Sequence, residues 1–174
     1  AGKTKILIDA GLSGKRIIEA LFSIGENPSE LSAILVTHEH SDHIKGVGII
    51  SRKFNIPVFA NKKTWEAMED FIGPIKMENM VCFDTQQEFE IGDICVKPFP
   101  IPHDAAEPVG FNMFVGTKKV TVATDIGHIN RSLLNSFEMS DLILLESNHD
   151  IEMLRVGRYP WPLKKRISSD IGHL

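Results

Sequence analysis

The sequence predicts an α/β fold with mixed sheets, organised as a single domain over residues 1–174. Apolar strand patterns alternate with helical patterns in the first half of the chain, whereas short strand patterns divided by turn residues fill most of the second half. Composition agrees with a globular domain, because 43% of the 174 residues are apolar and 24% are charged. No repeat, low-complexity tract or linker divides the chain.

The first half contains three strand patterns, each followed by a helical pattern. Wholly apolar runs are typical of buried strands, and apolar residues three and four apart define helix faces. Strands are expected at residues 6–8, 33–36 and 56–59, and helices at 17–22, 47–54 and 65–72. Ser13 is expected to cap the first helix, and Gly73-Pro74 to end the third.

The second half is predicted to form a meander followed by one more strand. Its strand patterns, which Gly, Pro and Asp turns separate, occupy residues 89–91, 94–96, 111–115 and 120–123. A short helix around residues 131–137 precedes the run Leu142-Ile143-Leu144-Leu145, which we expect to be a buried strand.

Composition and charge limit the class of protein. Cys82 and Cys95 are too few for a disulfide framework and lack paired metal-ligand spacing, which favours a reducing cytoplasm. No apolar run approaches the ~18 residues of a membrane span and no signal-peptide pattern is present, so we expect no membrane partner.

A basic segment closes a chain whose net charge is −4. Residues 155–174 hold five Lys or Arg residues against one Asp, a local charge of +4, together with Tyr159 and Trp161. Such a segment can contact a phosphate backbone. Charge runs more often form a solvated helix face, and the sequence leaves both interpretations open.

The strongest functional signal is Thr37-His38-Glu39-His40-Ser41-Asp42-His43, which lies after a strand and before a helix. Imidazole nitrogens and carboxylate oxygens are natural ligands of zinc, manganese and iron, and the absence of cysteine argues against a closed structural zinc site. A loop lets alternate residues turn towards two ions, which can share a hydroxide when they lie about 3.5–4 Å apart.

Further ligand candidates lie at strand ends. His103 follows the strand at residues 94–96, and Asp125 closes the strand at residues 120–123. Taken alone, such a His is more often a surface residue and such an Asp more often a turn former. Their order behind the histidine cluster makes them candidates.

Together these residues resemble the metallo-β-lactamase superfamily of dinuclear hydrolases. The match covers nearly the whole chain in the family's motif order, from Asp9 through a His-x-His-x-Asp-His signature, and implies an αβ/βα sandwich with mixed sheets. The resemblance implies six metal ligands: His38, His40, Asp42, His43, His103 and Asp125. It assigns the first two and His103 to one ion, Asp42 and His43 to a second, and Asp125 to a bridging position with a hydroxide. The implied cofactors are two divalent ions, zinc or manganese, and Asp9 is implied to support the loop.

The chain departs from the family pattern in one motif. A late histidine that completes the second metal site has no match before Leu174. Because the chain also starts inside a strand pattern, we expect a fold that is incomplete at both termini. His128 lies too near Asp125 for that motif, and His149 either faces the site or belongs to a polar helix start.

A narrower resemblance is to the YycJ/WalJ branch of cytoplasmic bacterial exonucleases, which are related to ribonuclease Z and ribonuclease J. It is carried by residues 9–15, 144–150, Tyr159-Pro160 and 163–174. The likeness to ribonuclease Z implies that Glu146 and His173 form a pair that donates a proton to the leaving oxygen. The alternative is a terminal histidine that is mobile in solvent.

The favoured hypothesis is a dinuclear metal-dependent phosphodiesterase, a 5′-3′ exonuclease on DNA that uses a metal-bridging hydroxide. Its catalytic residues would be Asp42, Glu146 and His173. One alternative is a small-molecule hydrolase of the same fold, acting on a thioester, lactone, lactam or cyclic phosphodiester. Another is a non-catalytic metal-binding regulatory module.

Overall fold

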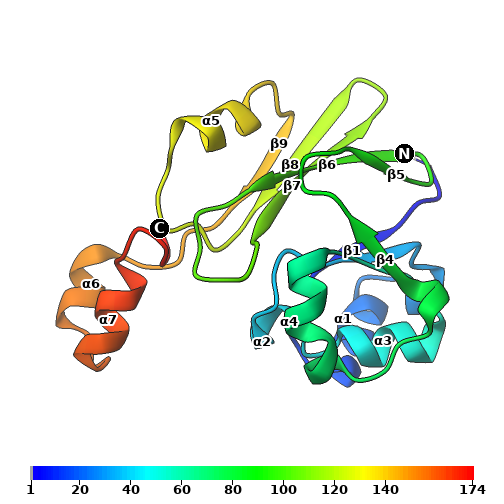
Figure 1. Ribbon diagram of the computed structural model, residues 1–174, viewed down its shortest axis with the longest axis horizontal. Coiled ribbons are helices and arrows are strands. Elements are labelled where there is room, and N and C mark those ends of the chain that lie inside the picture. Colours follow the sequence, from blue (N-terminus) through cyan, green and yellow to red (C-terminus); the bar gives the residue numbers. More distant parts are fainter. Residues whose placement is uncertain (1) are drawn as a thin grey trace.

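Two sheets pack face to face in the computed structural model, which describes residues 2–174 (Figure 1). The first sheet is parallel, in the order β1 (Ile6–Ile8), β2 (Ala33–Leu35), β3 (Val58–Asn61), β4 (Met80–Phe83). The second has the order β5 (Phe89–Ile91), β6 (Ile94–Pro100), β7 (Val109–Val115), β8 (Lys118–Ala123), β9 (Leu142–Leu145). Its pairs are antiparallel except β8 with β9, which are parallel. The predicted α/β fold with mixed sheets is confirmed, and β4 is a strand that the sequence analysis did not expect.

Helices cover the outer faces of both sheets. Those on the first sheet are α1 (Gly14–Ser23), α3 (Val47–Phe54) and α4 (Lys62–Ile72). On the second sheet lies α5 (Arg131–Phe137), whose Leu133 packs against Phe99. Single 3₁₀ turns, Pro28–Glu30 and Met77–Asn79, precede β2 and β4. None of the helices within residues 2–174 is long and apolar enough to cross a membrane.

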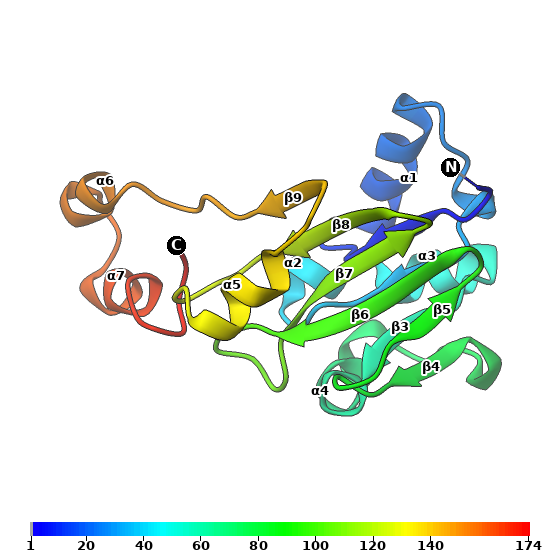
Figure 2. The same ribbon diagram turned by 90° about the horizontal axis from the view of Figure 1, so that it is seen from above.

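Two further helices, α6 (Ile151–Val156) and α7 (Trp161–Ile167), form a hairpin beyond the ends of the sheets, as Figures 1 and 2 both show. Asp150 caps α6 by accepting a hydrogen bond from the Met153 N–H at 2.8 Å, so the polar helix start expected near His149 is confirmed. Most of the basic residues in the segment 155–174 lie on this hairpin, because Arg155 belongs to α6 and Lys164, Lys165 and Arg166 belong to α7.

The buried strand β2 joins both cores. Ile34 packs among the helices, whereas Ala33 and Leu35 face the second sheet, where Leu35 lies in one cluster with Phe111. Each of these side chains has 0% exposure. Successive strand residues point to opposite faces, and both faces of β2 are covered, so its wholly apolar sequence is explained.

Strands of both sheets end at the same edge of the sandwich. In the first sheet all four parallel strands, β1 to β4, end there. In the second sheet β6 and β8 both run antiparallel to β7, and β9 runs parallel to β8, so all three end together. The Val109 N–H donates to the Thr37 carbonyl at 3.1 Å and ties the two sheets at this edge.

The strand β9 differs from the expectation of burial. Its four side chains are between 40% and 59% exposed. β9 is the edge strand of its sheet, with β8 as its strand neighbour among residues 2–174. The expectation that β9 is buried was therefore wrong. An apolar run shows only that a strand is suited to burial, because the elements that cover it come from elsewhere in the fold.

The backbone at Gly11, just after β1, packs closely against residues 37–43, which we call the signature loop. This close packing leads to a prediction about stability. A Cβ at Gly11 would lie 1.4 Å from the Asp42 carbonyl oxygen. The segments cannot move apart freely, since the Ala10 N–H donates to the His43 carbonyl at 2.6 Å. We expect Gly11→Ala to lower the free energy of unfolding by about 3 kcal/mol, measured by urea denaturation.

The matched control is Gly116→Ala. A Cβ at Gly116 would meet nothing within 4 Å, so this variant should lose only about 1 kcal/mol, from its left-handed backbone. Equal losses in the two variants would contradict the close approach at Gly11.

Candidate metal centre

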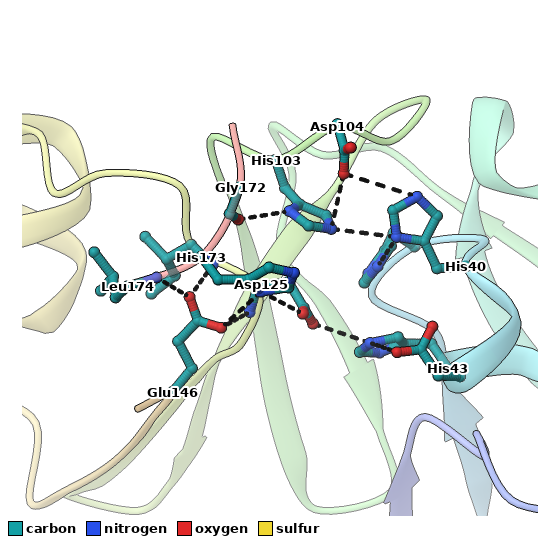
Figure 3. A network of polar contacts seen from close by, with 12 residues as sticks. His40, His43, His103, Asp104, Asp125, Glu146, Gly172, His173 and Leu174 are labelled. Atoms are coloured by element: carbon teal, nitrogen blue, oxygen red, sulfur yellow. Dashed lines mark hydrogen bonds and ion pairs between the residues drawn. The ribbon is translucent and has the colours of Figure 1, made fainter. Parts of the chain in front are cut away.

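Three imidazoles converge where the two sheets meet. His38 and His40 belong to the signature loop after β2, and His103 follows β6. The Nδ1 atom of His40 lies 3.0 Å from His38 Nε2 and 3.2 Å from His103 Nε2. Both His38 and His103 are buried, and Figure 3 shows His103 and His40 facing each other.

Groups behind two of the rings fix the nitrogen that carries the proton. His103 Nδ1 donates to the Gly172 carbonyl at 3.1 Å, which leaves a lone pair on Nε2 (Figure 3). Thr37 Oγ1 donates to Asp9 Oδ2 at 2.8 Å and accepts from His38 Nδ1 at 2.9 Å. Lone pairs on two Nε2 atoms therefore point at one position beside His40 Nδ1, which is the arrangement a cation would satisfy.

Burial keeps two of these rings neutral. Desolvation is the largest effect lowering the pKa of His38, and the neighbouring His43 and His40 lower it further. Desolvation also lowers the pKa of His103, although the Gly172 carbonyl acts in the opposite direction. Neutral imidazole is the form that binds a divalent cation.

A second group lies around His43. Its Nε2 is 2.9 Å from Asp125 Oδ2, and its Nδ1 is 2.8 Å from Asp9 Oδ2. Desolvation lowers the pKa of His43, but the two carboxylates outweigh it and raise the pKa to about 10. Burial raises the pKa of Asp125, but His43 outweighs this and holds it well below its usual value. A cation at His43 Nε2 must therefore compete with a proton.

The two carboxylates beside His43 adopt an uncommon backbone conformation. Asp9 follows β1 with φ 57° and Asp125 follows β8 with φ 55°. Among residues with a Cβ, Asp is one of the few that tolerate the left-handed region. Each strand therefore turns sharply at the residue whose carboxylate contacts His43.

A third group joins Asp125 to the end of the described chain. His173 Nδ1 lies 3.2 Å from Asp125 Oδ1 and 3.2 Å from Glu146 Oε2 (Figure 3). Backbone N–H groups of Asp125, Ile126 and Leu174 also donate to Glu146, which follows β9. The structure thus brings together the two residues that the ribonuclease Z resemblance pairs.

Three sets of side chains within residues 2–174 have ligand atoms close enough for one cation, all within 4.8 Å of one another. The sets are His38, His40, His103; His38, His43, Asp125; and His103, Asp125, His173. Imidazole nitrogens and a carboxylate oxygen are ligand types that divalent zinc and manganese prefer. The residues present therefore fit divalent metal ions.

Asp42 lies outside these three sets, in contrast to the ligand role that the resemblance implies. Its side chain is 80% exposed, and Oδ2 lies 3.9 Å from His43 Nε2. It occupies the first turn of the short helix α2 (Ser41–Ile44). Adjacent residues of a helix point about 100° apart, so Asp42 faces solvent while His43 faces inwards.

The other two histidines also lie outside the sets. His128 is exposed and its Nδ1 donates to the Asp170 carbonyl at 2.7 Å. His149 precedes α6, and its backbone N–H donates to the Leu174 carbonyl at 3.4 Å. Neither ring belongs to a candidate ligand set of the described chain.

Asp104, which adjoins the three-histidine set, is not among the site residues predicted from the sequence. Its Oδ1 lies 3.4 Å from His103 Nε2 and 4.0 Å from His40 Nε2. The Arg166 guanidinium of α7 donates to both carboxylate oxygens, at 2.5 and 3.0 Å, and lowers the pKa of Asp104. The position of Asp104 directly after His103 could have identified it from the sequence. The sequence offers no such signal for the Gly172 carbonyl, because every residue has a backbone carbonyl.

Comparison with known proteins agrees with this architecture. A family model described as beta-lactamase superfamily domain matches residues 4–174. Exodeoxyribonuclease YycJ of Bacillus anthracis is 48% identical over 171 residues, which are 98% of this chain and 64% of that protein. Exodeoxyribonuclease WalJ of Streptococcus pneumoniae strain D39 is 43% identical over 174 residues, 99% of this chain and 65% of that protein. The chain thus spans just under two thirds of the length of these relatives.

Solved structures share the fold. Zn(2+)-bound PqqB of Methylobacterium extorquens has a TM-score of 0.76 at 18% identity, covering 97% of this chain and 64% of that one. The metallo-β-lactamase fold protein YhfI of Bacillus subtilis has a TM-score of 0.73 at 19% identity, covering 86% of this chain and 62% of that one. These similarities confirm the predicted metallo-β-lactamase fold.

The position of Asp9 predicts a loss of metal affinity in Asp9→Asn. The variant keeps a side chain that tolerates positive φ but removes the charge that faces Thr37 Oγ1 and His43 Nδ1. We expect zinc affinity to fall about 10–100-fold, measured by competition with a chromophoric chelator. Asp70→Asn, on the exposed side of α4, is the control and should bind zinc as the parent does. Unchanged affinity in Asp9→Asn would exclude an orienting role.

Proposed function

This chain belongs to the beta-lactamase superfamily, and on that basis we propose that it is a metal-dependent phosphodiesterase, a 5′-3′ exonuclease that acts on DNA. The observation that carries the proposal is the convergence of His38, His40 and His103 beside Asp125 and His43 at one sheet edge. The exodeoxyribonuclease names of two relatives, 48% and 43% identical, support DNA as the substrate. The free thiols of Cys82 and Cys95 fit the reducing cytoplasm, where we propose that it acts.

The proposed cofactors are two divalent cations, zinc or manganese. His38, His40 and His103 would hold one, and His43 with Asp125 would hold the other. Asp42 is a further carboxylate beside this second position, 3.9 Å from His43 Nε2. When bound, the cations would supply Lewis-acid activation of water and neutralise charge that develops on the phosphate.

The chain's own groups would keep the ligands oriented. Asp9 and Thr37 hold His43 and His38 from behind, and the Gly172 carbonyl holds His103. Rings held in this way lose little further rotational entropy when a cation or substrate binds. The site is therefore preorganised by hydrogen bonds that do not themselves face the substrate.

His173 is the proposed proton donor to the leaving oxygen. Its Nδ1 proton is held between Asp125 Oδ1 and Glu146 Oε2, each at 3.2 Å. The proton that the ring can give away is therefore the one on Nε2, and Glu146 acts as a positioning residue.

The first test measures degradation of 5′-phosphorylated, 3′-labelled duplex DNA by the full chain. We expect degradation with manganese or zinc that a chelator abolishes. Asp125→Asn should reduce the rate about 100-fold or more, because it removes a charged ligand atom that two candidate sets share.

Two further variants complete this test. Asp70→Asn is the control and should degrade DNA as the parent does. Asp42→Ala with full turnover would exclude a catalytic role for that side chain. A parent chain that leaves DNA intact but hydrolyses a thioester or lactone would overturn the nuclease proposal.

A second test concerns proton donation by His173. His173→Ala should slow DNA hydrolysis about 100-fold, because the leaving alkoxide then departs without a proton. Hydrolysis of a p-nitrophenyl phosphodiester releases p-nitrophenolate, which is stable as an anion without a proton, so this reaction should slow only roughly tenfold or less. His128→Ala serves as the control histidine. Equal losses of kcat on both substrates would contradict general-acid catalysis.

A further inference from the structure

The hairpin of α6 and α7 borders a pocket of about 680 Å³ that adjoins the candidate metal centre. Six lining residues combine apolar and cationic groups: Ile151, Leu154, Arg155, Trp161, Lys164 and Lys165. The pocket wall also includes His173, whose Nδ1 contacts Asp125 at 3.2 Å. His173 therefore lies between the candidate metal centre and the pocket.

The aromatic and cationic side chains of the pocket suit a polyanion that contains flat rings. The Trp161 residue is 73% exposed, so a face of its indole is available for stacking. Lys165 has no ion-pair partner among residues 2–174. Residues 155–174 carry five cations against one Asp in a chain of net charge −4, so positive charge concentrates here. Aromatic stacking beside cations is how proteins bind unpaired nucleotides.

His149 adds a second observation at the same pocket. Its ring lines the wall, and its Nδ1 atom is buried with no hydrogen-bond partner in the part of the chain that the structure describes. A buried polar atom without a partner is costly, and a ligand in the pocket can supply one when the His149 ring turns this edge towards the pocket. A purely apolar ligand would leave this nitrogen without a partner.

We propose that this pocket binds an unpaired nucleotide of the DNA strand whose phosphate lies in the metal centre. The base stacks on Trp161 and the flanking phosphate lies by Lys165. The polar edge of the base meets the His149 ring, which turns Nδ1 towards the pocket when the nucleotide binds. This inference rests on the proposed function and deepens it. Bases of an intact duplex are stacked and inaccessible, so the pocket requires a single-stranded or frayed end.

The test is binding of a fluorescent single-stranded oligodeoxynucleotide to the full chain in chelator, followed by anisotropy. Trp161→Ala should weaken binding about tenfold, whereas Trp161→Phe, which keeps a stacking ring, should retain most of the affinity. Lys165→Ala should lower the slope of log affinity against log salt by about 0.7. Lys15→Ala, with a side chain 85% exposed on α1, is the control and should bind as the parent does.

Four outcomes would overturn the pocket assignment. The first is unchanged affinity in Trp161→Ala. The second is a blunt duplex that binds as tightly as the single strand. The third is a ribo-oligonucleotide that binds more than about tenfold tighter, which would assign the pocket to RNA. The fourth is loss of an oligomer in sedimentation of Trp161→Ala with oligonucleotide binding intact, which would make the hairpin a contact between copies of the chain.

Failure of this inference is distinguishable from failure of the proposed function. If the parent hydrolyses DNA with metal while the hairpin variants bind the oligonucleotide normally, the pocket assignment alone is wrong. If the parent hydrolyses no nucleic acid with zinc or manganese, the proposed function is wrong, whatever the binding measurements show.

Discussion

The carboxylate of Asp9 anchors the signature loop to the first sheet, and the geometry of the candidate metal centre depends on this anchor. It accepts hydrogen bonds from the Thr37 N–H, the Thr37 hydroxyl and His43 Nδ1, each at 2.8 Å. Through the Thr37 hydroxyl it also determines which nitrogen of His38 is free. One side chain after β1 therefore orients two rings that follow β2, because the parallel strands end at the same edge.

The second half of the centre depends on main-chain groups from the end of the described chain. The Gly172 carbonyl fixes the His103 ring, and the Leu174 N–H donates to Glu146 at 2.9 Å. Beside them, the Asp104 N–H donates to the Ile171 carbonyl at 3.1 Å. Backbone groups of one short segment thus hold side chains that follow β6 and β9. Such a segment has little freedom to move without displacing the candidate ligands.

The candidate metal centre and the hairpin of α6 and α7 are in direct contact. Arg166 of α7 binds both oxygens of Asp104, which lies beside His103 and His40, and His173 belongs to both the centre and the pocket wall. A strand bound along the hairpin would therefore approach the ligands from a direction that these contacts define. Proximity of this kind is an efficient way to use binding energy from groups remote from the reacting phosphate.

Local patterns in the sequence determined most of the elements and the identity of the candidate ligands. Apolar runs and helical spacing located the strands around residues 34 and 122 and the helices around residues 50 and 68, because these patterns reflect backbone periodicity. The density of imidazoles in the signature loop, with His103 and Asp125 at strand ends, indicated metal chemistry for the same local reason. Only the tertiary structure decided the exposure of β9, the outward direction of Asp42, the ion pair of Asp104 with Arg166 and the role of the Gly172 carbonyl. Each of these depends on which distant segment lies alongside, and long-range contacts leave no periodic signal in the sequence.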